Sequence, residues 1–152
     1  VKTETLFTEL TEYADNIEND KKIHLTSENN AENFYISMDK FRVLQALKNV
    51  VTNSLDAIDK EGRIEIKFFE ENQKLKISIS DNGSGIPEEA LAKVFEPFYT
   101  SKSKGFGLGL AIVKKIVERH KGTISMDSKP GVGTKTTIIF PGLEKYIGAL
   151  DG

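Results

Sequence analysis

The chain has 152 residues, of which 38% are hydrophobic and 29% charged, and its formal net charge at pH 7 is −2. A chain of this length and composition can form one soluble globular domain with a core of its own. The balanced charge argues against nucleic-acid binding through a bulk basic surface, the absence of cysteine excludes disulfides and thiolate metal sites, and no apolar run is long enough to span a bilayer.

The first part of the chain predicts two helices that flank a pair of short strands. An amphipathic pattern predicts a helix over residues 4–18. Asp39 is expected to cap a second helix, which runs to about Lys60 and is stopped by Gly62. The strands are "KIHLTSE" at 22–28 and "NFYIS" at 33–37. The core side of the second helix is expected to be Leu44, Leu47, Val51, Leu55 and Ile58.

The rest of the chain predicts two β-hairpins and two further helices. The first hairpin joins alternating patterns at 63–71 and 74–81 through Asn72 and Gln73. Pro87 is expected at the first position of a helix over 87–95. The remaining predicted elements are a loop at 95–107, a helix at 108–122 closed by Gly122, and strands at 123–128 and 134–141. The tail, 142–152, carries no interpretable signal.

The order of these elements predicts the fold class. Strands come in adjacent pairs rather than singly between helices, so the sheet should be largely antiparallel with helices on one face. We therefore expect one domain, residues 1–152, with an α/β two-layer sandwich fold: a mostly antiparallel mixed sheet covered on one face by helices.

The helix that follows Asp39 carries a stripe of polar side chains. Gln45, Asn49, Asn53 and Asp56 are three or four residues apart, which places them on one side of a helix. A solvated face is the simple alternative, but such faces usually carry Lys, Glu and Arg. Because an amide oxygen is a hard neutral ligand that suits Mg²⁺ beside phosphate oxygens, we interpret the stripe as a ligand-facing surface.

The segment "DNGSGIP" at 81–87 follows an apolar strand. Asp81 closes the strand, and Gly83 and Gly85 permit close backbone approach. The carboxylate can accept a hydrogen bond from an amine-bearing ring, and Ile86 and Pro87 can pack on the face of that ring. A glycine-rich turn without a ligand is the alternative.

A second glycine-rich segment, "TSKSKGFGLGLAIVKK", leads directly into a helix. A helix N-terminus offers free amides and a favourable dipole for phosphate, and Lys102 and Lys104 come just before it. The segment matches neither the P-loop nor the dinucleotide fingerprint. A surface loop with a helix cap is the alternative.

Together with "GVGT" at 131–134, these motifs resemble the ATP-binding catalytic domain of sensor histidine kinases. These domains belong to the superfamily with the Bergerat fold, which includes gyrase and the mismatch-repair ATPases. The resemblance covers about residues 1–141. It identifies an N box at 45–57, a first glycine box at 81–87, an F box at 95–100, an ATP lid at 95–106, a second glycine box at 105–110 and a GxGT motif at 131–134.

The resemblance implies roles for individual residues in binding ATP or ADP with Mg²⁺. Asn53 would coordinate Mg²⁺ and Asn49 would lie close to the phosphates. Asp81 would take the adenine amino group, and Thr134 would help to hold the adenine edge through water. The implied binding set is completed by Gly83 and Gly85, which would let the base seat; by Gly107, Leu108 and Gly109, which would wrap the phosphates; and by Asp56, Ile86, Tyr99, Thr100, Lys102, Lys104, Gly105, Phe106 and Leu110.

Two departures from the wider superfamily bear on the reaction. Many relatives place Lys or Arg three residues after the metal-binding Asn, where this chain has Asp56, so Lys102 and Lys104 are expected to neutralise the β- and γ-phosphates. In the hydrolysing branch a Glu activates water at the position of Asn49, and an amide cannot act as that base. The expected reaction is therefore γ-phosphoryl transfer to a histidine, with four catalytic residues: Asn49, Asn53, Lys102 and Lys104.

The resemblance also implies partners outside this chain. His24 and His120 lack the phosphoacceptor pattern and are interpreted as structural, so the nucleophilic histidine is expected on a separate dimerisation domain. Because the chain starts at Val1, we expect it to be a fragment of a longer protein, whose membrane-embedded parts, if it has any, lie outside this piece. The fragment is expected to be cytoplasmic and monomeric, with a response regulator as a further partner and no contact with nucleic acid or membrane. An ATP-hydrolysing enzyme and an anti-sigma-type serine kinase are the alternatives. An aromatic patch beside the lid is expected either to pack on the helical partner or to anchor the lid: Phe95, Phe98 and Tyr99.

Overall fold

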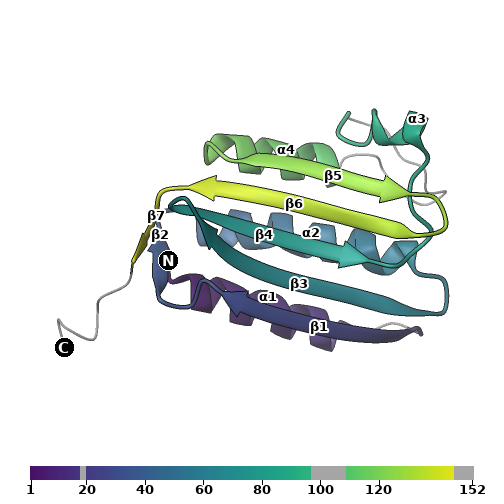
Figure 1. Cartoon of the computed structure of the whole chain (residues 1–152), viewed down its shortest axis with the longest axis horizontal. Helices are drawn as coiled ribbons and strands as arrows, with labels where there is room; N and C mark the ends of the chain where they lie inside the picture. Colours follow the sequence, from purple (N-terminus) through teal and green to yellow (C-terminus); the bar gives the residue numbers. More distant parts are fainter. Residues whose placement is uncertain (18–19, 97–108, 146–152) are drawn as a thin grey trace.

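Helices cover one face of a five-stranded mixed sheet in the computed structural model, which describes residues 1–17, 20–96 and 109–145 (Figure 1). The strands, in spatial order, are β1 (Lys22–Asn30), β3 (Glu61–Glu71), β4 (Lys74–Asp81), β6 (Gly133–Pro141) and β5 (Thr123–Lys129). β1 is parallel to β3, and all other neighbours are antiparallel. The covering helices are α1 (Thr3–Asn16), α2 (Lys40–Ala57) and α4 (Gly109–Arg119). The predicted two-layer sandwich is confirmed.

A second, two-stranded sheet lies at the end of the molecule that holds the N-terminus (Figure 1). It pairs β2 (Phe34–Ile36) with β7 (Leu143–Lys145) in antiparallel register. The sequence predicts the first of these strands but not the second. β7 forms because Leu143 reaches the core, where its side chain is only 4% exposed.

The core lies between the five-stranded sheet and the helices. β3 alternates buried and more exposed side chains over most of its length, as its sequence pattern predicts for a strand with one covered face. Asn72 and Gln73 join β3 to β4 with positive φ angles of 53° and 62°, which are those of a type I′ hairpin turn. All five core positions predicted for the second helix are buried, including Ile58, which lies just after the end of α2.

The end of α2 differs from the prediction. The helix ends at Ala57, three residues before Lys60, and Ile58 takes an extended conformation that buries its side chain to 2% exposure. Gly62 does not stop the helix, because it lies within β3 and is buried. A side chain there would meet the Asn82 side-chain oxygen at 2.7 Å, which is the physical reason for a glycine. The helix thus ends earlier than its apolar pattern predicts, because the extended conformation of Ile58 buries its side chain in the core.

Two other helix ends also differ from the prediction. α3 is a single turn (Glu88–Leu91), and Pro87 is its N-cap rather than its first helical residue. At the end of α4 the left-handed residue is Lys121, with φ of 61°, and Gly122 follows it. The amide of Gly122 donates to the Val117 carbonyl at 2.9 Å, as in a Schellman motif. Gly122 is needed for space, since a Cβ there would meet the Ile139 carbonyl oxygen at 2.6 Å.

Within residues 1–17, 20–96 and 109–145, no helix combines the length and apolar character needed to cross a bilayer.

Candidate functional site

The last residue of β4, Asp81, lies where β4, β6 and the end of α2 meet. Its backbone pairs with Thr134 of β6. Its carboxylate accepts a hydrogen bond from the Gly83 amide at 2.8 Å. Burial raises the pKa of the Asp81 carboxyl above its ordinary value of 3.8, and the Gly83 amide, the Ser54 hydroxyl of α2 and the Thr134 amide act in the opposite direction. The side chain is thus oriented by the turn that follows β4 while it remains partly exposed.

The glycines around Asp81 are required by contacts within the protein. A Cβ on Gly83 would lie 2.6 Å from the Ala57 carbonyl oxygen at the end of α2. Gly85 has φ of 75° and presses against the Lys129 carbonyl, and Gly133 has φ of 145° and presses against the Asp81 carbonyl. The resemblance implies that Gly83 and Gly85 allow the adenine base to approach the backbone closely. In the structure they allow the turn after β4 to pack on α2 and on the β5–β6 hairpin.

Ser128 of β5 belongs to the same junction, and the sequence analysis does not identify it. Its hydroxyl lies 2.8 Å from the Ile86 amide nitrogen, 3.0 Å from the Gly133 carbonyl oxygen and 2.7 Å from the Thr134 hydroxyl oxygen. It therefore links β5, β6 and the turn after β4. The register of the β5–β6 hairpin, which places Ser128 opposite Thr134, is the signal that could have found it.

The amide stripe of α2 lies beside this junction. Asn53 precedes Ser54, which contacts Asp81, and Asn49 is one turn earlier on the same side of the helix. Both amides are half-buried, whereas Gln45 is exposed. Asp56 is exposed as well. The stripe therefore combines two amides at the border of the core with two solvated positions, rather than forming one uniform face.

Several predicted site residues lie outside the described residues: Tyr99, Thr100, Lys102, Lys104, Gly105, Phe106, Gly107 and Leu108. Gly109 is described and begins α4, and Leu110 is half-buried in the first turn. Phe95 lies before the undescribed segment, and the Lys114 ammonium of α4 lies 5.5 Å from the centre of its ring. This contact favours a role of Phe95 within the domain. Phe98, like Tyr99, lies outside the described residues.

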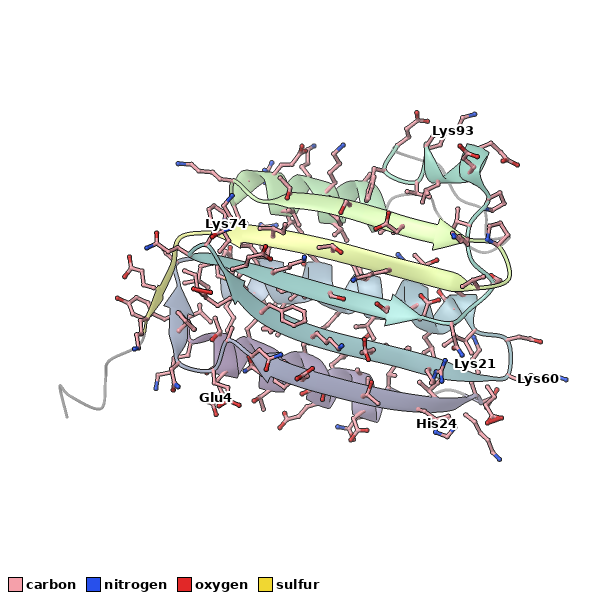
Figure 2. All side chains as sticks on the ribbon, in the orientation of Figure 1. Glu4, Lys21, His24, Lys60, Lys74 and Lys93 are labelled. Carbon is pink, nitrogen blue, oxygen red and sulfur yellow. The ribbon has the colours of Figure 1, made fainter. Side chains whose placement is uncertain are left out.

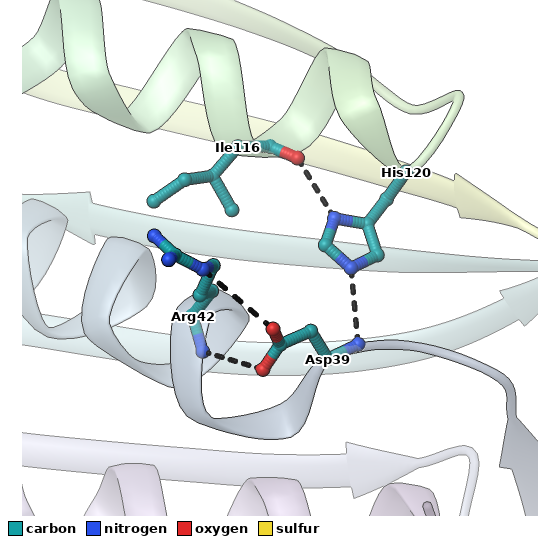
Figure 3. Close-up of polar contacts among 4 residues, drawn as sticks. All are labelled: Asp39, Arg42, Ile116 and His120. Carbon is teal, nitrogen blue, oxygen red and sulfur yellow. Dashed lines mark hydrogen bonds and ion pairs between the residues drawn. The ribbon is translucent and has the colours of Figure 1, made fainter.

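The two histidines make ordinary structural contacts. His120 follows α4, and Figure 3 shows its ring between the Ile116 carbonyl, 2.8 Å from Nδ1, and the Asp39 amide, which donates to Nε2 at 3.0 Å. It thereby ties the end of α4 to the start of α2. His24 forms an exposed pair with Glu61 at 3.5 Å.

Because His120 joins the end of α4 to the start of α2, the two helices run in opposite directions. The carbonyl end of α2 and the amide end of α4 thus point toward the same end of the sheet, where β4 terminates (Figure 1). The arrangement offers hydrogen-bond acceptors at Asp81 and backbone donors at the start of α4.

Comparisons with known proteins agree with this fold. The family described as "Histidine kinase-, DNA gyrase B-, and HSP90-like ATPase" matches residues 38–144. The solved catalytic domain of the histidine kinase ThkA is 30% identical and superposes with a TM-score of 0.81 over 93% of both chains. The sensor histidine kinase ZraS of Escherichia coli (strain K12) is 41% identical over 106 residues, which is 70% of this chain and 23% of that protein.

A further relative is the sporulation kinase A of Bacillus subtilis (strain 168), which is 36% identical over 110 residues. The match covers 72% of this chain and 18% of that kinase, so the chain spans about a fifth of the length of these curated relatives. With the family match, the fold and the ThkA superposition, these findings show that the chain belongs to the histidine kinase-, DNA gyrase B- and HSP90-like ATPases, and within them to the ATP-binding catalytic domains of sensor histidine kinases.

Proposed function

We propose that this domain binds Mg-ATP and donates the γ-phosphoryl group to a histidine on a separate dimerisation domain. Asp81 would accept the adenine amine where β4 ends. The phosphates would extend past Asn49 and Asn53 toward the first turn of α4 at Gly109. Membership of the family supports nucleotide binding. Transfer of the phosphoryl group to a histidine is the more specific part of the proposal.

The observation that carries the proposal is the environment of the Asp81 carboxylate. An ionised carboxylate has about four acceptor positions, and the Gly83 amide takes one of them at 2.8 Å. Because Asp81 is only partly buried, the carboxylate keeps an acceptor position for a ligand. One N–H of an exocyclic amine satisfies it, whereas a carbonyl in the same place would set two acceptors against each other.

Asn53 is the proposed protein ligand for Mg²⁺. Within the ranges described, no group of three or more His, Cys, Asp or Glu side chains could hold a metal. Mg²⁺ in nucleotide sites usually takes few protein ligands and keeps waters and phosphate oxygens. One amide oxygen beside the phosphates fits that chemistry, and the ion would neutralise charge on the transferred group. Metal binding should therefore depend on nucleotide.

Asn49 supports a kinase rather than a hydrolase. It lies one helical turn before Asn53, so a Glu at this position could reach a water near the same phosphates. An amide has no basic site that can take a proton from water at neutral pH. Phosphoryl transfer depends mainly on positioning and charge neutralisation, so a site without a base suits a nucleophile supplied by another domain.

The remaining parts of the proposal concern the lid and the whole protein. Lys102 and Lys104 would neutralise the β- and γ-phosphates, since Asp56 cannot. Gly107, Leu108 and Gly109 would wrap the phosphates, with Tyr99, Thr100 and their neighbours closing over the nucleotide. The full protein would be a cytoplasmic or membrane-anchored sensor kinase that passes the phosphoryl group to a response regulator, and the domain alone would be monomeric.

The test is steady-state phosphate release at saturating Mg-ATP, with bound nucleotide measured in the same sample. We expect an occupied but nearly silent domain. Asn49→Glu should raise phosphate release, and Asn49→Gln, which keeps an amide, should not. Sustained turnover by the wild-type chain would instead identify a nucleotide-hydrolysing enzyme and overturn the assignment of Asn49. Transfer to a serine-bearing rather than a histidine-bearing acceptor would identify the alternative kinase class.

A further inference from the structure

The hydroxyl of Ser128 has three polar neighbours, and their chemistry fixes the direction of each hydrogen bond. The Ile86 amide, 2.8 Å away, can only donate. The Gly133 carbonyl, 3.0 Å away, can only accept. The Thr134 hydroxyl, 2.7 Å away, can do either.

One arrangement satisfies all three contacts. A serine hydroxyl has one proton and two lone pairs. The proton must go to the Gly133 carbonyl, because two oxygen acceptors with no proton between them would otherwise meet. One lone pair accepts from Ile86, so the other accepts the Thr134 proton. Ser128 therefore leaves Thr134 with no proton to offer to a ligand.

The Thr134 oxygen and the Asp81 carboxylate lie on paired residues of neighbouring strands. Asp81 and Thr134 are register partners in β4 and β6, so their side chains lie on the same face of the sheet. With the hydroxyl proton directed at Ser128, both side chains present only acceptors at this position. Two acceptors can each take a proton from an exocyclic amine, or one from the amine and one from a bridging water. A carbonyl oxygen in the same place would bring a third acceptor with no proton, so it is disfavoured.

We propose that Ser128 is a positioning residue that holds the Thr134 hydroxyl as an acceptor, so that the site selects a purine with an exocyclic amine over a 6-oxo purine. The inference rests on the proposed nucleotide site and adds a residue that determines its specificity. Ser128 acts through Thr134 and makes no contact with the base itself.

The experiment measures the dissociation constants of ADP and inosine 5′-diphosphate for the 152-residue chain and reports their ratio. Ser128→Ala frees the Thr134 hydroxyl to rotate and donate to the 6-oxo group. We expect the preference for ADP to fall roughly three- to tenfold, the value of about one neutral hydrogen bond. Ser128→Thr keeps the hydroxyl and should retain the wild-type ratio.

A second pair of variants tests whether Ser128 acts through Thr134. Thr134→Val removes the fixed acceptor and leaves Ser128 bonded to Ile86 and Gly133, so it should also lower the ratio. In the Thr134→Val background, Ser128→Ala should then produce no further change, because coupled residues are non-additive. A purely structural role of Ser128 would weaken both nucleotides equally, so Ser128→Ala would leave the ratio at the wild-type value.

The outcomes separate the two proposals. A folded wild-type chain that binds neither nucleotide contradicts the proposed function, and this inference with it. Normal ADP binding with an unchanged ratio in Ser128→Ala overturns the inference and leaves the function standing. If Ser128→Ala fails to fold, Thr134→Val decides: an unchanged ratio in that variant overturns the inference as well.

Discussion

At its first turn α2 is held by contacts that are all internal to the helix layer, whereas at its last turn it is built into the candidate site. Asp39 accepts from the Arg42 amide at 3.2 Å, and its own amide donates to His120 at 3.0 Å (Figure 3). These bonds satisfy donors that a helix start leaves exposed. They stabilise the helix and tie it to α4.

The last turn of α2 uses its carbonyl groups to position other segments. The Lys21 ammonium donates to the Leu55 carbonyl at 2.8 Å, and the Ser84 amide donates to the Ala57 carbonyl at 2.9 Å. Figure 2 shows Lys21 at this end of the sheet, opposite Lys74. The turn that carries Asp81 and Gly83 is thereby attached to the helix end. One helix thus has a first turn that is tied to α4 and a last turn to which the turn carrying Asp81 is attached.

Gly85→Ala is expected to have the largest effect and to test how tightly the site end is built. Gly85 and Gly131 have nearly equal φ angles, 75° and 77°, but a Cβ on Gly85 would collide with the Lys129 carbonyl, while a Cβ on Gly131 meets nothing within 4 Å. Both alanine variants should lose about 1–2 kcal/mol through backbone strain. Gly85→Ala should lose a further ~1–3 kcal/mol through overpacking.

Urea unfolding of the two variants gives this difference directly. Gly131→Ala is the matched control because it carries the strain without the collision. Equal losses in the two variants would mean that the turn after β4 can move away from β5, and that the site end is less rigid than the contacts of Gly85 indicate.

Asp81→Asn is expected to have the next largest effect, on binding rather than on folding. The amide keeps one acceptor oxygen, which the Gly83 amide can still use, but replaces the other oxygen with an NH₂ group that cannot accept from a ligand. Loss of a charged hydrogen-bond partner is worth about 1.5–3 kcal/mol, so ADP affinity should fall by roughly one to two orders of magnitude. Equilibrium dialysis with labelled ADP measures it. An unchanged affinity would remove Asp81 from the site.

The elements that depend on local pattern were predictable from the sequence. The amphipathic helices, the Asn72–Gln73 hairpin and the Asp39 cap require only periodicity and turn chemistry, and the structure confirms all of them. The helix end at Ala57 was not predictable in this way, because burial of Ile58 is a tertiary effect. β7 was missed for the same reason.

The site shows a similar division. The place of Asp81 at the end of β4 was predictable, because a carboxylate that ends an apolar strand before a glycine turn is a local signal. The contacts of Gly83 and Gly85 with Ala57 and Lys129 were not, because they join segments far apart in the sequence. Ser128 is one serine among several in the sequence. Only the register of β5 against β6 shows that it bonds to Thr134.

His120→Ala tests the other end of α2, with a smaller expected effect. The variant loses two hydrogen bonds and a ring contact with Phe140, whose centre lies 6.0 Å away. We expect the free energy of unfolding to fall by about 1–2 kcal/mol and the ADP-to-IDP ratio to stay unchanged. His24→Ala is the control: its pair with Glu61 is exposed and should contribute little. A changed nucleotide ratio in His120→Ala would show that the two ends of α2 are coupled.

The pH dependence of stability carries the smallest expected effect and returns to Asp81. Burial raises the pKa of this carboxyl in the folded state, so the folded chain holds its proton at pH values where the unfolded chain has lost it. The unfolded state therefore binds fewer protons above pH 3.8, and the contribution of Asp81 to stability falls as pH rises from there through the raised pKa.

Asp81→Asn does not titrate, so the difference in unfolding free energy between the wild type and this variant isolates the effect. Measured without nucleotide, that difference should shift in favour of the variant as pH rises and then level off. A shift in the opposite direction would mean that the interactions of the charged carboxylate with Ser54, Gly83 and Thr134 outweigh its burial.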